Sequence, residues 1–286
     1  MPSSPNKPYI GRIAPSPTGY LHLGHARTFR IAHQRARAAG GKLIFRMEDL
    51  DAPRCQPEFA AAAIDDLKWF GLDWDEGPDI GGPRAPYLQS ERMSFYREAL
   101  EQLIRADLVY PCTCSRKDIQ TAVSAPNEGD EEPVYPGNCR NRTAKDVPTT
   151  GRFNWRFRVR DSETVTFVDG HLGPHSFTAG KDFGDFVVWR HDGIPSYQLA
   201  VVTDDILMGI TEVVRGADLL VSTARQILLY QMLGAQIPEF YHCELVRDSQ
   251  GLRLAKRHDS LSLRTLRKQG ADPDLLMNLA EKPVSN

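Results

Sequence analysis

Apolar residues along this chain fall into two patterns that alternate from the N-terminus onward. Short, mainly apolar runs at 9–13 and 42–47 are typical of buried strands. Between them, apolar residues recur at the three- to four-residue spacing of a helix, at Ala26, Phe29, Ala32 and Ala36. The same helical spacing predicts helices at 56–70, 90–106 and 219–233. Strands and helices that alternate in this way predict an α/β fold.

The middle of the chain follows a different pattern. In residues 152–160, arginines alternate with aromatic and aliphatic residues at period two, which predicts a strand with one apolar and one mostly basic face. Further strands are expected at 165–170 and 185–190. We therefore expect a β-rich region inserted into the α/β frame.

The amino-acid composition agrees with the predicted fold and limits where in the cell the protein is expected. The 286 residues suffice for two or three small units, and 41% hydrophobic and 25% charged residues are ordinary for a soluble globular protein. No apolar run approaches the roughly 18 residues that span a bilayer. The first eight residues lack the apolar core of a secretory signal. We expect a cytoplasmic protein without a membrane partner.

The net charge of −2 does not by itself indicate a nucleic-acid partner. Any RNA contact would therefore use local basic clusters, and each cluster has the more common alternative of a solvated face. The candidates are Arg27, Arg30, Arg35 and Arg37; Arg140 and Arg142; Arg152, Arg156, Arg158 and Arg160; and Arg264, Arg267 and Lys268.

Polar groups gather where the first strand gives way to the first helix. Two prolines and a glycine separate the two elements, and His22 and His25 lie at the helix start, on either side of Gly24. Helix starts present unpaired N–H groups and partial positive charge, which suit phosphate, and a glycine lets another group approach the backbone. On spacing alone, the two histidines could equally be ordinary polar residues.

Acidic residues follow the second predicted strand, at Glu48, Asp49 and Asp51. Open α/β sheets bind ligands at the carboxyl ends of their strands, so Glu48 is a candidate binding residue. The alternative is that these side chains solvate a loop or cap the next helix.

Three of the five cysteines lie close in sequence, at Cys112, Cys114 and Cys139. Thiolates favour zinc, which takes about four ligands, so three cysteines leave one position open. The alternative is three reduced structural cysteines. Cys55 and Cys243 lie apart and are interpreted as structural, and an odd number of cysteines argues against a disulfide framework.

Several of these stretches resemble one protein family. Residues 12–25, Arg-Ile-Ala-Pro-Ser-Pro-Thr-Gly-Tyr-Leu-His-Leu-Gly-His, resemble the His-Ile-Gly-His signature of class I aminoacyl-tRNA synthetases, in the form of their glutamyl and glutaminyl branch. Phe-Arg-Met-Glu-Asp-Leu-Asp at 45–51 and Leu-Met-Gly-Ile-Thr-Glu-Val-Val-Arg-Gly-Ala-Asp at 207–218 resemble the same branch. The resemblance implies a Rossmann-like catalytic domain, and a ligase that forms an aminoacyl-adenylate from ATP, bound with Mg²⁺, and L-glutamate.

The resemblance also implies roles for individual residues. His22 and His25 would contact the ATP phosphates and, with Lys256, form the catalytic set. ATP binding would involve His22, Gly24, His25 and Lys256. Glutamate binding would involve Arg12, Ala14, Ser16, Glu48, Tyr197 and Arg215, with Glu48 holding the α-amino group. The residue types fit, because Arg12 and Arg215 can each offer paired donors to a carboxylate.

Two further motifs match the family only in part. Residues 251–258, Gly-Leu-Arg-Leu-Ala-Lys-Arg-His, occupy the place of its Lys-Met-Ser-Lys-Ser loop, with Arg253 for the first lysine and Ala255 for the serine. Lys256 keeps the second lysine. The spacing Cys-x-Cys-x20-Tyr-x3-Cys resembles a structural zinc site of short glutamyl-branch proteins, and this likeness makes Tyr135 the fourth ligand, although water could replace it.

The length of the chain indicates which members of the family it resembles most. The chain ends at residue 286, only 29 residues after Arg257, which leaves no room for a separate anticodon-binding domain. The short paralogues that attach glutamate to queuosine in the anticodon loop of tRNA(Asp) fit best. The alternatives are a truncated enzyme that charges a tRNA 3′ end and a non-catalytic RNA- or nucleotide-binding paralogue.

The family pattern also divides the chain. We expect a first catalytic half at 1–108, an inserted acceptor-binding-like subdomain with the zinc site at 109–190, a second catalytic half at 191–236, and a helical stem-contact region with the lysine loop at 237–286. We expect a monomer.

Overall fold

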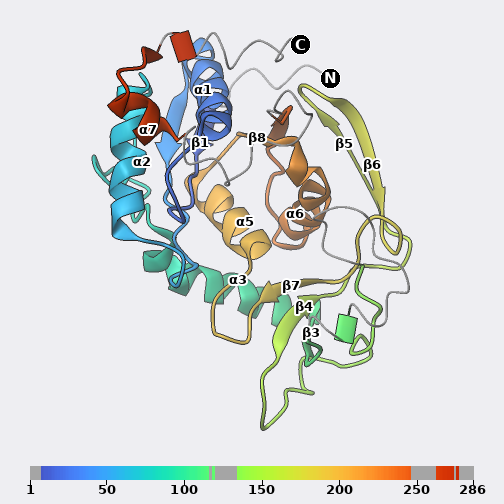
Figure 1. Cartoon of the computed structure of the whole chain (residues 1–286). Coiled ribbons are helices and arrows are strands. Elements are labelled where there is room, and N and C mark those ends of the chain that lie inside the picture. The colour runs from blue at the N-terminus through green and yellow to red at the C-terminus, as the bar shows by residue number, and fades with distance from the viewer. Residues whose placement is uncertain (1–7, 116–117, 120–133, 246–261, 274, 277–286) are drawn as a thin grey trace.

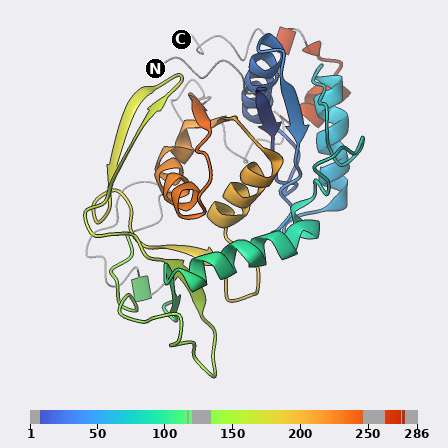
Figure 2. The same cartoon turned by 180° about the vertical axis from the view of Figure 1, so that it is seen from behind.

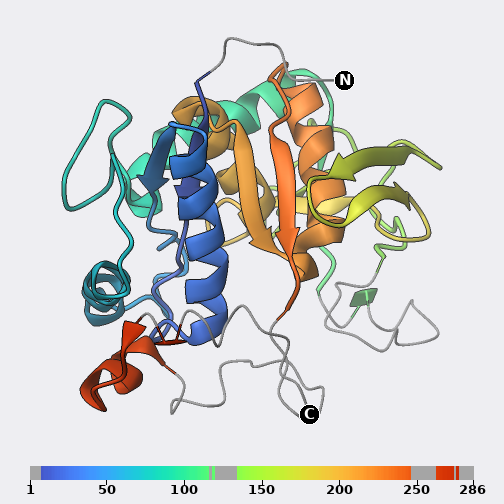
Figure 3. The ribbon, with the colours of Figure 1, turned by 90° about the horizontal axis from the view of Figure 1, so that it is seen from above.

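A computed structural model describes residues 8–115, 118–119, 134–245, 262–273 and 275–276. Two pairs of short parallel strands lie at its centre (Figures 1 and 3). β1 (Ile10–Ile13) pairs in parallel with β2 (Lys42–Phe45), and β8 (Glu212–Gly216) pairs in parallel with β9 (Glu239–Cys243). The Thr211 N–H donates to the Ile10 carbonyl at 2.8 Å, so β1 lies beside β8 and the two pairs form one layer.

Helices cover both faces of this sheet, because side chains along a strand point alternately to opposite sides. Phe45 and Val214 face α1 (Leu23–Ala38), α2 (Pro57–Trp69) and α7 (Leu263–Lys268). Ile44 and Val213 face α3 (Met93–Arg105), α5 (Tyr197–Met208) and α6 (Leu220–Met232). The result is a three-layer α/β sandwich with a separate apolar core on each side of the sheet (Figure 2).

The predicted helices are confirmed with small changes at their ends. The one expected at 90–106 begins with a 3-10 turn, η1 (Gln89–Arg92), before α3. The helix expected at 56–70 ends at Trp69, and Gly71, two residues later, has the positive φ of 81° that favours glycine. None of the helices described is long and apolar enough to cross a bilayer.

The remaining strands lie between α3 and α5 in the chain. β3 (Val109–Cys112), β4 (Asn154–Phe157) and β7 (Phe186–Trp189) form an antiparallel sheet in the order β3-β4-β7. β5 (Thr164–Asp169) and β6 (Gly173–Thr178) form a hairpin that lies next to α6 (Figure 1). The hairpin also reaches the central sheet, because the Gly170 N–H donates to the Phe240 carbonyl of β9 at 2.8 Å. A 3-10 turn, η2 (Ala217–Leu219), follows β8.

The expected basic face of residues 152–160 is wrong for its central residue. Arg156 is only 2% exposed, its Nη1 donates to the Asp185 carbonyl at 2.8 Å, and its guanidinium lies 4.0 Å from the ring centre of Tyr135. Arg158 donates to the Arg142 carbonyl at 2.8 Å. These arginines therefore hold the inserted region together instead of facing solvent.

Other candidate RNA-binding arginines are paired with carboxylates. Arg35 donates to Glu212 at 2.8 Å, Arg37 to Asp75 at 2.8 Å, and Arg264 to Asp66 at 3.1 Å. Each pair reduces the positive field that the cluster presents to a phosphate backbone.

Candidate active site

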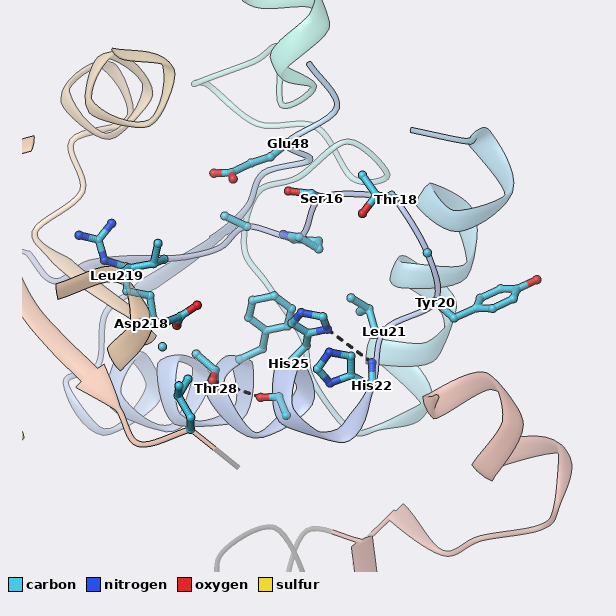
Figure 4. Close-up of a pocket in the computed structure, with 18 of the residues that line it drawn as sticks. Ser16, Thr18, Tyr20, Leu21, His22, His25, Thr28, Glu48, Asp218 and Leu219 are labelled. Atoms are coloured by element: carbon cyan, nitrogen blue, oxygen red, sulfur yellow. Dashed lines mark hydrogen bonds between the residues drawn. The ribbon is translucent and has the colours of Figure 1, made fainter. Parts of the chain in front are cut away.

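A cavity of about 880 Å³ opens at the carboxyl ends of β1, β2 and β8, beside the start of α1 (Figure 4). Every residue that the sequence assigned to ATP or glutamate, within the described part of the chain, lines it. These residues are Arg12, Ala14, Ser16, His22, Gly24, His25, Glu48, Tyr197 and Arg215. Lys256, Arg253 and Ala255 lie outside the described residues. Four segments far apart in sequence therefore meet around one space.

One wall of the cavity is the start of α1. His22 is the residue at the N-cap, with extended backbone, and the ring centres of His22 and His25 lie 3.8 Å apart. The His22 N–H lies 3.5 Å from Nδ1 of His25, and Thr28 donates to the Gly24 carbonyl at 3.2 Å (Figure 4). The first turn carries no acidic residue. This wall therefore offers helix N–H groups and imidazoles to an anion.

Arg215 provides a buried positive charge at another wall. It is 5% exposed, and its three recorded bonds all run to neutral acceptors. Nε donates to Nε2 of His242 at 3.2 Å, Nη1 to Gln226 at 2.8 Å, and Nη2 to Thr223 at 2.6 Å. No carboxylate of the described residues contacts it. A buried guanidinium in this state favours an anionic ligand, and a carboxylate fits its planar donors.

Arg12 lies nearby but is already engaged. It is 5% exposed, its Nη1 donates to the Val214 carbonyl at 2.9 Å, and its Nε lies 3.7 Å from Oδ1 of Asp205. Tyr197 begins α5 and is 39% exposed, so its ring is open to the cavity. Arg12, Tyr197 and Arg215 together give one part of the cavity a surplus of donors.

Glu48 is one of three acidic residues that line the cavity, together with Asp218 and Glu244. The Glu48 N–H donates to the Pro15 carbonyl at 2.9 Å, which ties the strand end to the loop that contains Ala14 and Ser16. Burial raises the pKa of Glu48, although the neighbouring Arg46 acts in the opposite direction. Figure 4 shows Glu48 and Ser16 on the opposite side of the cavity from His22 and His25.

A buried network beneath the cavity was missed from the sequence. Arg46 donates to Asp205 at 2.6 Å, and Asp204 accepts bonds from Arg92 at 2.6 Å and Tyr96 at 3.0 Å. Consecutive acidic residues in a helix usually indicate an exposed face, yet Asp204 and Asp205 are 0% and 2% exposed. Their position in an otherwise apolar helix was the available signal.

The three clustered cysteines meet as the spacing predicted. The sulfur atoms of Cys112, Cys114 and Cys139 all lie within 4.8 Å of one another. Oη of Tyr135 lies 3.4 Å from the sulfur atoms of Cys112 and Cys114, and the Cys139 N–H donates to it at 2.9 Å. Although burial opposes it, the Thr113 N–H and the Tyr135 hydroxyl lower the pKa of Cys139 to about 7. Three sulfur donors and one phenolic oxygen in this space can hold one metal ion.

The other two cysteines stay outside this cluster. Cys243 is buried in β9 and Cys55 is partly exposed, and all five cysteines are free thiols.

Comparison with known proteins agrees with this site. The family described as "tRNA synthetases class I (E and Q), catalytic domain" matches residues 10–282. Over 263 residues the chain is 51% identical to the glutamyl-Q tRNA(Asp) synthetase of Nitratidesulfovibrio vulgaris, covering 91% of this chain and 81% of that protein. It is 49% identical over 272 residues to the glutamyl-Q tRNA(Asp) synthetase of Symbiobacterium thermophilum, covering 93% of this chain and 84% of that protein.

Longer relatives match over the same region. Glutamate–tRNA ligase 2 of Syntrophus aciditrophicus is 44% identical over 276 residues, covering 95% of this chain and 56% of that protein. The crystal structure of a glutamate tRNA ligase from Elizabethkingia meningosepticum in complex with its amino acid superposes with a TM-score of 0.76 at 31% identity. The match covers 92% of this chain and 53% of the solved chain, so this chain spans about half the length of that protein. The chain therefore belongs to the class I tRNA synthetases of the glutamate and glutamine branch and contains their catalytic domain.

Proposed function

We propose that this synthetase activates L-glutamate with ATP and transfers the glutamate to the queuosine base in the anticodon loop of tRNA(Asp). The observation that carries the choice of glutamate is Arg215, a buried guanidinium without a carboxylate partner among the described residues. Glutamate supplies that partner, whereas the amide of glutamine does not.

In this proposal the amino acid is bound at both ends. Its side-chain carboxylate accepts bonds from Arg215, Arg12 and the Tyr197 hydroxyl. Its α-ammonium group pairs with Glu48, and the loop through Ala14 and Ser16 lies against its backbone. The α-carboxylate is then held toward the start of α1, where the triphosphate binds.

Activation needs little acid–base chemistry. The α-carboxylate is ionised at neutral pH, so one of its oxygens can attack the α-phosphorus of ATP without a general base. The new carboxyl oxygen–phosphorus bond forms as the bond from the α-phosphorus to the bridging oxygen breaks, and pyrophosphate leaves with those electrons. His22, His25 and Lys256 stabilise the negative charge that develops on the phosphates. Mg²⁺ bound with ATP supplies further positive charge.

The second step transfers the glutamyl group to an RNA hydroxyl. The glutamyl-Q tRNA(Asp) synthetases of Nitratidesulfovibrio vulgaris and Symbiobacterium thermophilum support a hydroxyl of queuosine, because the chain is more identical to these two proteins, at 51% and 49%, than to the glutamate–tRNA ligase, at 44%. The ligases support the second candidate, a tRNA 3′ end. Because ATP and tRNA are available in the cytoplasm, we expect the enzyme to act there. We also expect it to be a monomer.

We further propose that Cys112, Cys114, Cys139 and Tyr135 hold one structural zinc ion. The sulfur-rich donor set favours zinc, and the ligands come from two parts of the inserted region: Cys112 and Cys114 from the end of β3 and the residues just after it, and Tyr135 and Cys139 from the turn around residue 137. The metal would order this region and would take no part in adenylate formation.

ATP–pyrophosphate exchange over a panel of amino acids, without RNA, tests the activation step. Glutamate should support exchange far better than glutamine or aspartate. Equal exchange with glutamate and glutamine would contradict the role assigned to Arg215.

A further inference from the structure

His242 connects the predicted substrate-binding Arg215 to an acidic residue of the inserted hairpin. Its Nδ1 lies 2.6 Å from Oδ2 of Asp169, at the end of β5, and its Nε2 lies 3.2 Å from Nε of Arg215, in β8. All three residues are buried: His242 is 0% exposed, Asp169 3% and Arg215 5%. A buried chain of carboxylate, imidazole and guanidinium therefore ends at the cavity.

The charged partners of the ring set one arrangement of its protons, whereas the Thr223 hydroxyl, 3.0 Å from Nε2, can either donate to that nitrogen or accept from it. A guanidinium can donate but cannot accept, so Nε2 of His242 must accept from Arg215 and carry no proton. The proton of the neutral ring is then on Nδ1, where Asp169 accepts it. Burial and the charge of Arg215 lower the pKa of His242 to about 4, which keeps the ring neutral at physiological pH.

Asp169 is itself fixed as an acceptor. Its Oδ1 accepts the backbone N–H groups of His171 at 3.0 Å, Leu172 at 2.9 Å and His242 at 3.1 Å. Although burial opposes it, the Leu172 N–H and the His242 ring lower the pKa of Asp169. The ionised carboxylate is therefore preorganised before any ligand binds.

The anchoring leaves part of Arg215 for a ligand. Three of its five N–H groups are used: one on Nε bonds to His242, one on Nη1 to Gln226 and one on Nη2 to Thr223. One N–H remains on each Nη. Three fixed bonds hold the guanidinium plane, so the remaining donors keep a constant direction.

We propose that Asp169 and His242 are positioning residues for amino-acid selection, with Asp169 setting the imidazole tautomer and the imidazole setting the orientation of the Arg215 guanidinium. This inference rests on the proposed glutamate specificity. The inference also gives the inserted hairpin a role in choosing the amino acid, because Asp169 belongs to that hairpin. Asp169 and His242 would act through Arg215, without touching the amino acid.

The variant Asp169→Asn tests the tautomer directly. Its amide keeps an oxygen for the backbone N–H groups but places an NH₂ against Nδ1, so the ring must accept there and carry its proton on Nε2, facing the Arg215 Nε–H. In ATP–pyrophosphate exchange, the KM for glutamate should rise by about tenfold to a hundredfold, the scale of a lost bond to a charged group. The preference for glutamate over glutamine should fall, and the KM for ATP should not change.

Matched variants separate positioning from folding. The side-chain amide of His242→Gln can place an oxygen near the position of Nε2, so this variant should retain a lower KM for glutamate than His242→Phe. His171→Asn changes a histidine on the same turn whose ring contacts Tyr241, and it should behave as wild type. Nitrogen NMR of the imidazole should show the Nδ1–H tautomer in wild type and the Nε2–H tautomer in Asp169→Asn.

The outcomes distinguish the inference from the function on which it rests. A wild-type protein that does not exchange with glutamate overturns the proposed function. If wild type exchanges but Asp169→Asn keeps the wild-type KM for glutamate, or if the tautomer is unchanged, the positioning role is wrong. A parallel loss of ATP and glutamate binding with a lowered unfolding temperature would assign Asp169 to folding alone and would also overturn it.

Discussion

Arg46 lies directly beneath Glu48, and its Nη2 donates to Oε1 of Glu48 at 3.0 Å. Arg46 is completely buried, and the aspartates of α5 neutralise it from the other side. Glu48 is therefore a partly buried carboxylate that is oriented by a fixed cation and has one side facing the cavity. That arrangement suits a group that must bind an ammonium ion without moving.

Glu48→Gln should weaken glutamate binding. The amide removes the charge that faces the α-ammonium group, so the KM for glutamate in ATP–pyrophosphate exchange should rise by about tenfold or more, with the KM for ATP unchanged. Because burial raises the pKa of Glu48, the wild-type KM for glutamate should also rise as pH falls toward the carboxyl range, starting above the pH at which an ordinary glutamate protonates. The variant should lose this contribution. A wild-type KM in the variant would remove Glu48 from the site.

Arg215→Gln should abolish the preference for glutamate. Without the Arg215 guanidinium, the side-chain carboxylate of glutamate loses one of its two proposed charged partners, at a cost of about 1–3 kcal/mol or more. Exchange with glutamate should fall by at least about tenfold relative to glutamine. Arg190→Gln is the matched control, since Arg190 is partly exposed and pairs with Asp192. An unchanged ratio in Arg215→Gln would contradict the proposed specificity.

Lys256→Ala and His22→Ala should slow adenylate formation. Each removes a group proposed to stabilise phosphate charge, so the exchange rate should fall by about 10²-fold, with little change in the KM for glutamate. Arg257→Ala is the control within the same loop. An unchanged rate in Lys256→Ala, with a loss in Arg257→Ala or Arg253→Ala, would assign the phosphate contact to an arginine.

Metal analysis tests the cysteine cluster. Protein purified without chelator should contain about one zinc ion per chain, and the double variant Cys112→Ser, Cys114→Ser should contain none. Cys55→Ser, outside the cluster, should keep the metal. Tyr135→Phe should bind zinc more weakly if the phenolic oxygen is the fourth ligand, and equally well if water is. Metal-free wild-type protein with full activity would contradict a structural zinc site.

The fold was predictable where a single periodicity governs a segment. The helical stripe of α1 and the apolar runs of β1 and β2 identified the α/β frame, and the cavity lies where the strands end. β3, β6 and β9 were missed. β3 is interrupted by Pro111, β6 is only partly buried on its hairpin, and β9 contains His242 where an apolar residue would normally be buried.

The ligand-facing residues were also predictable, but not those that hold them. Arg12, Glu48 and Arg215 lie in motifs that resemble a family, so each could be assigned from the sequence. Asp169 and His242 are separated by 73 positions and lie in no such motif, and only the packing of the hairpin against β9 brings them together. Burial of Arg156 was unpredictable for the same reason, because its partners come from other segments.

The central claim is the acceptor, and transfer of labelled glutamate to a shortened tRNA tests it most directly. The substrate is tRNA(Asp) without its 3′-terminal adenosine, prepared with and without queuosine. Because the proposed nucleophile is a hydroxyl of queuosine, label should attach to the shortened RNA that contains queuosine and not to the RNA that lacks it. Attachment that requires the 3′ adenosine and is indifferent to queuosine would contradict the account and show that the enzyme charges a tRNA 3′ end.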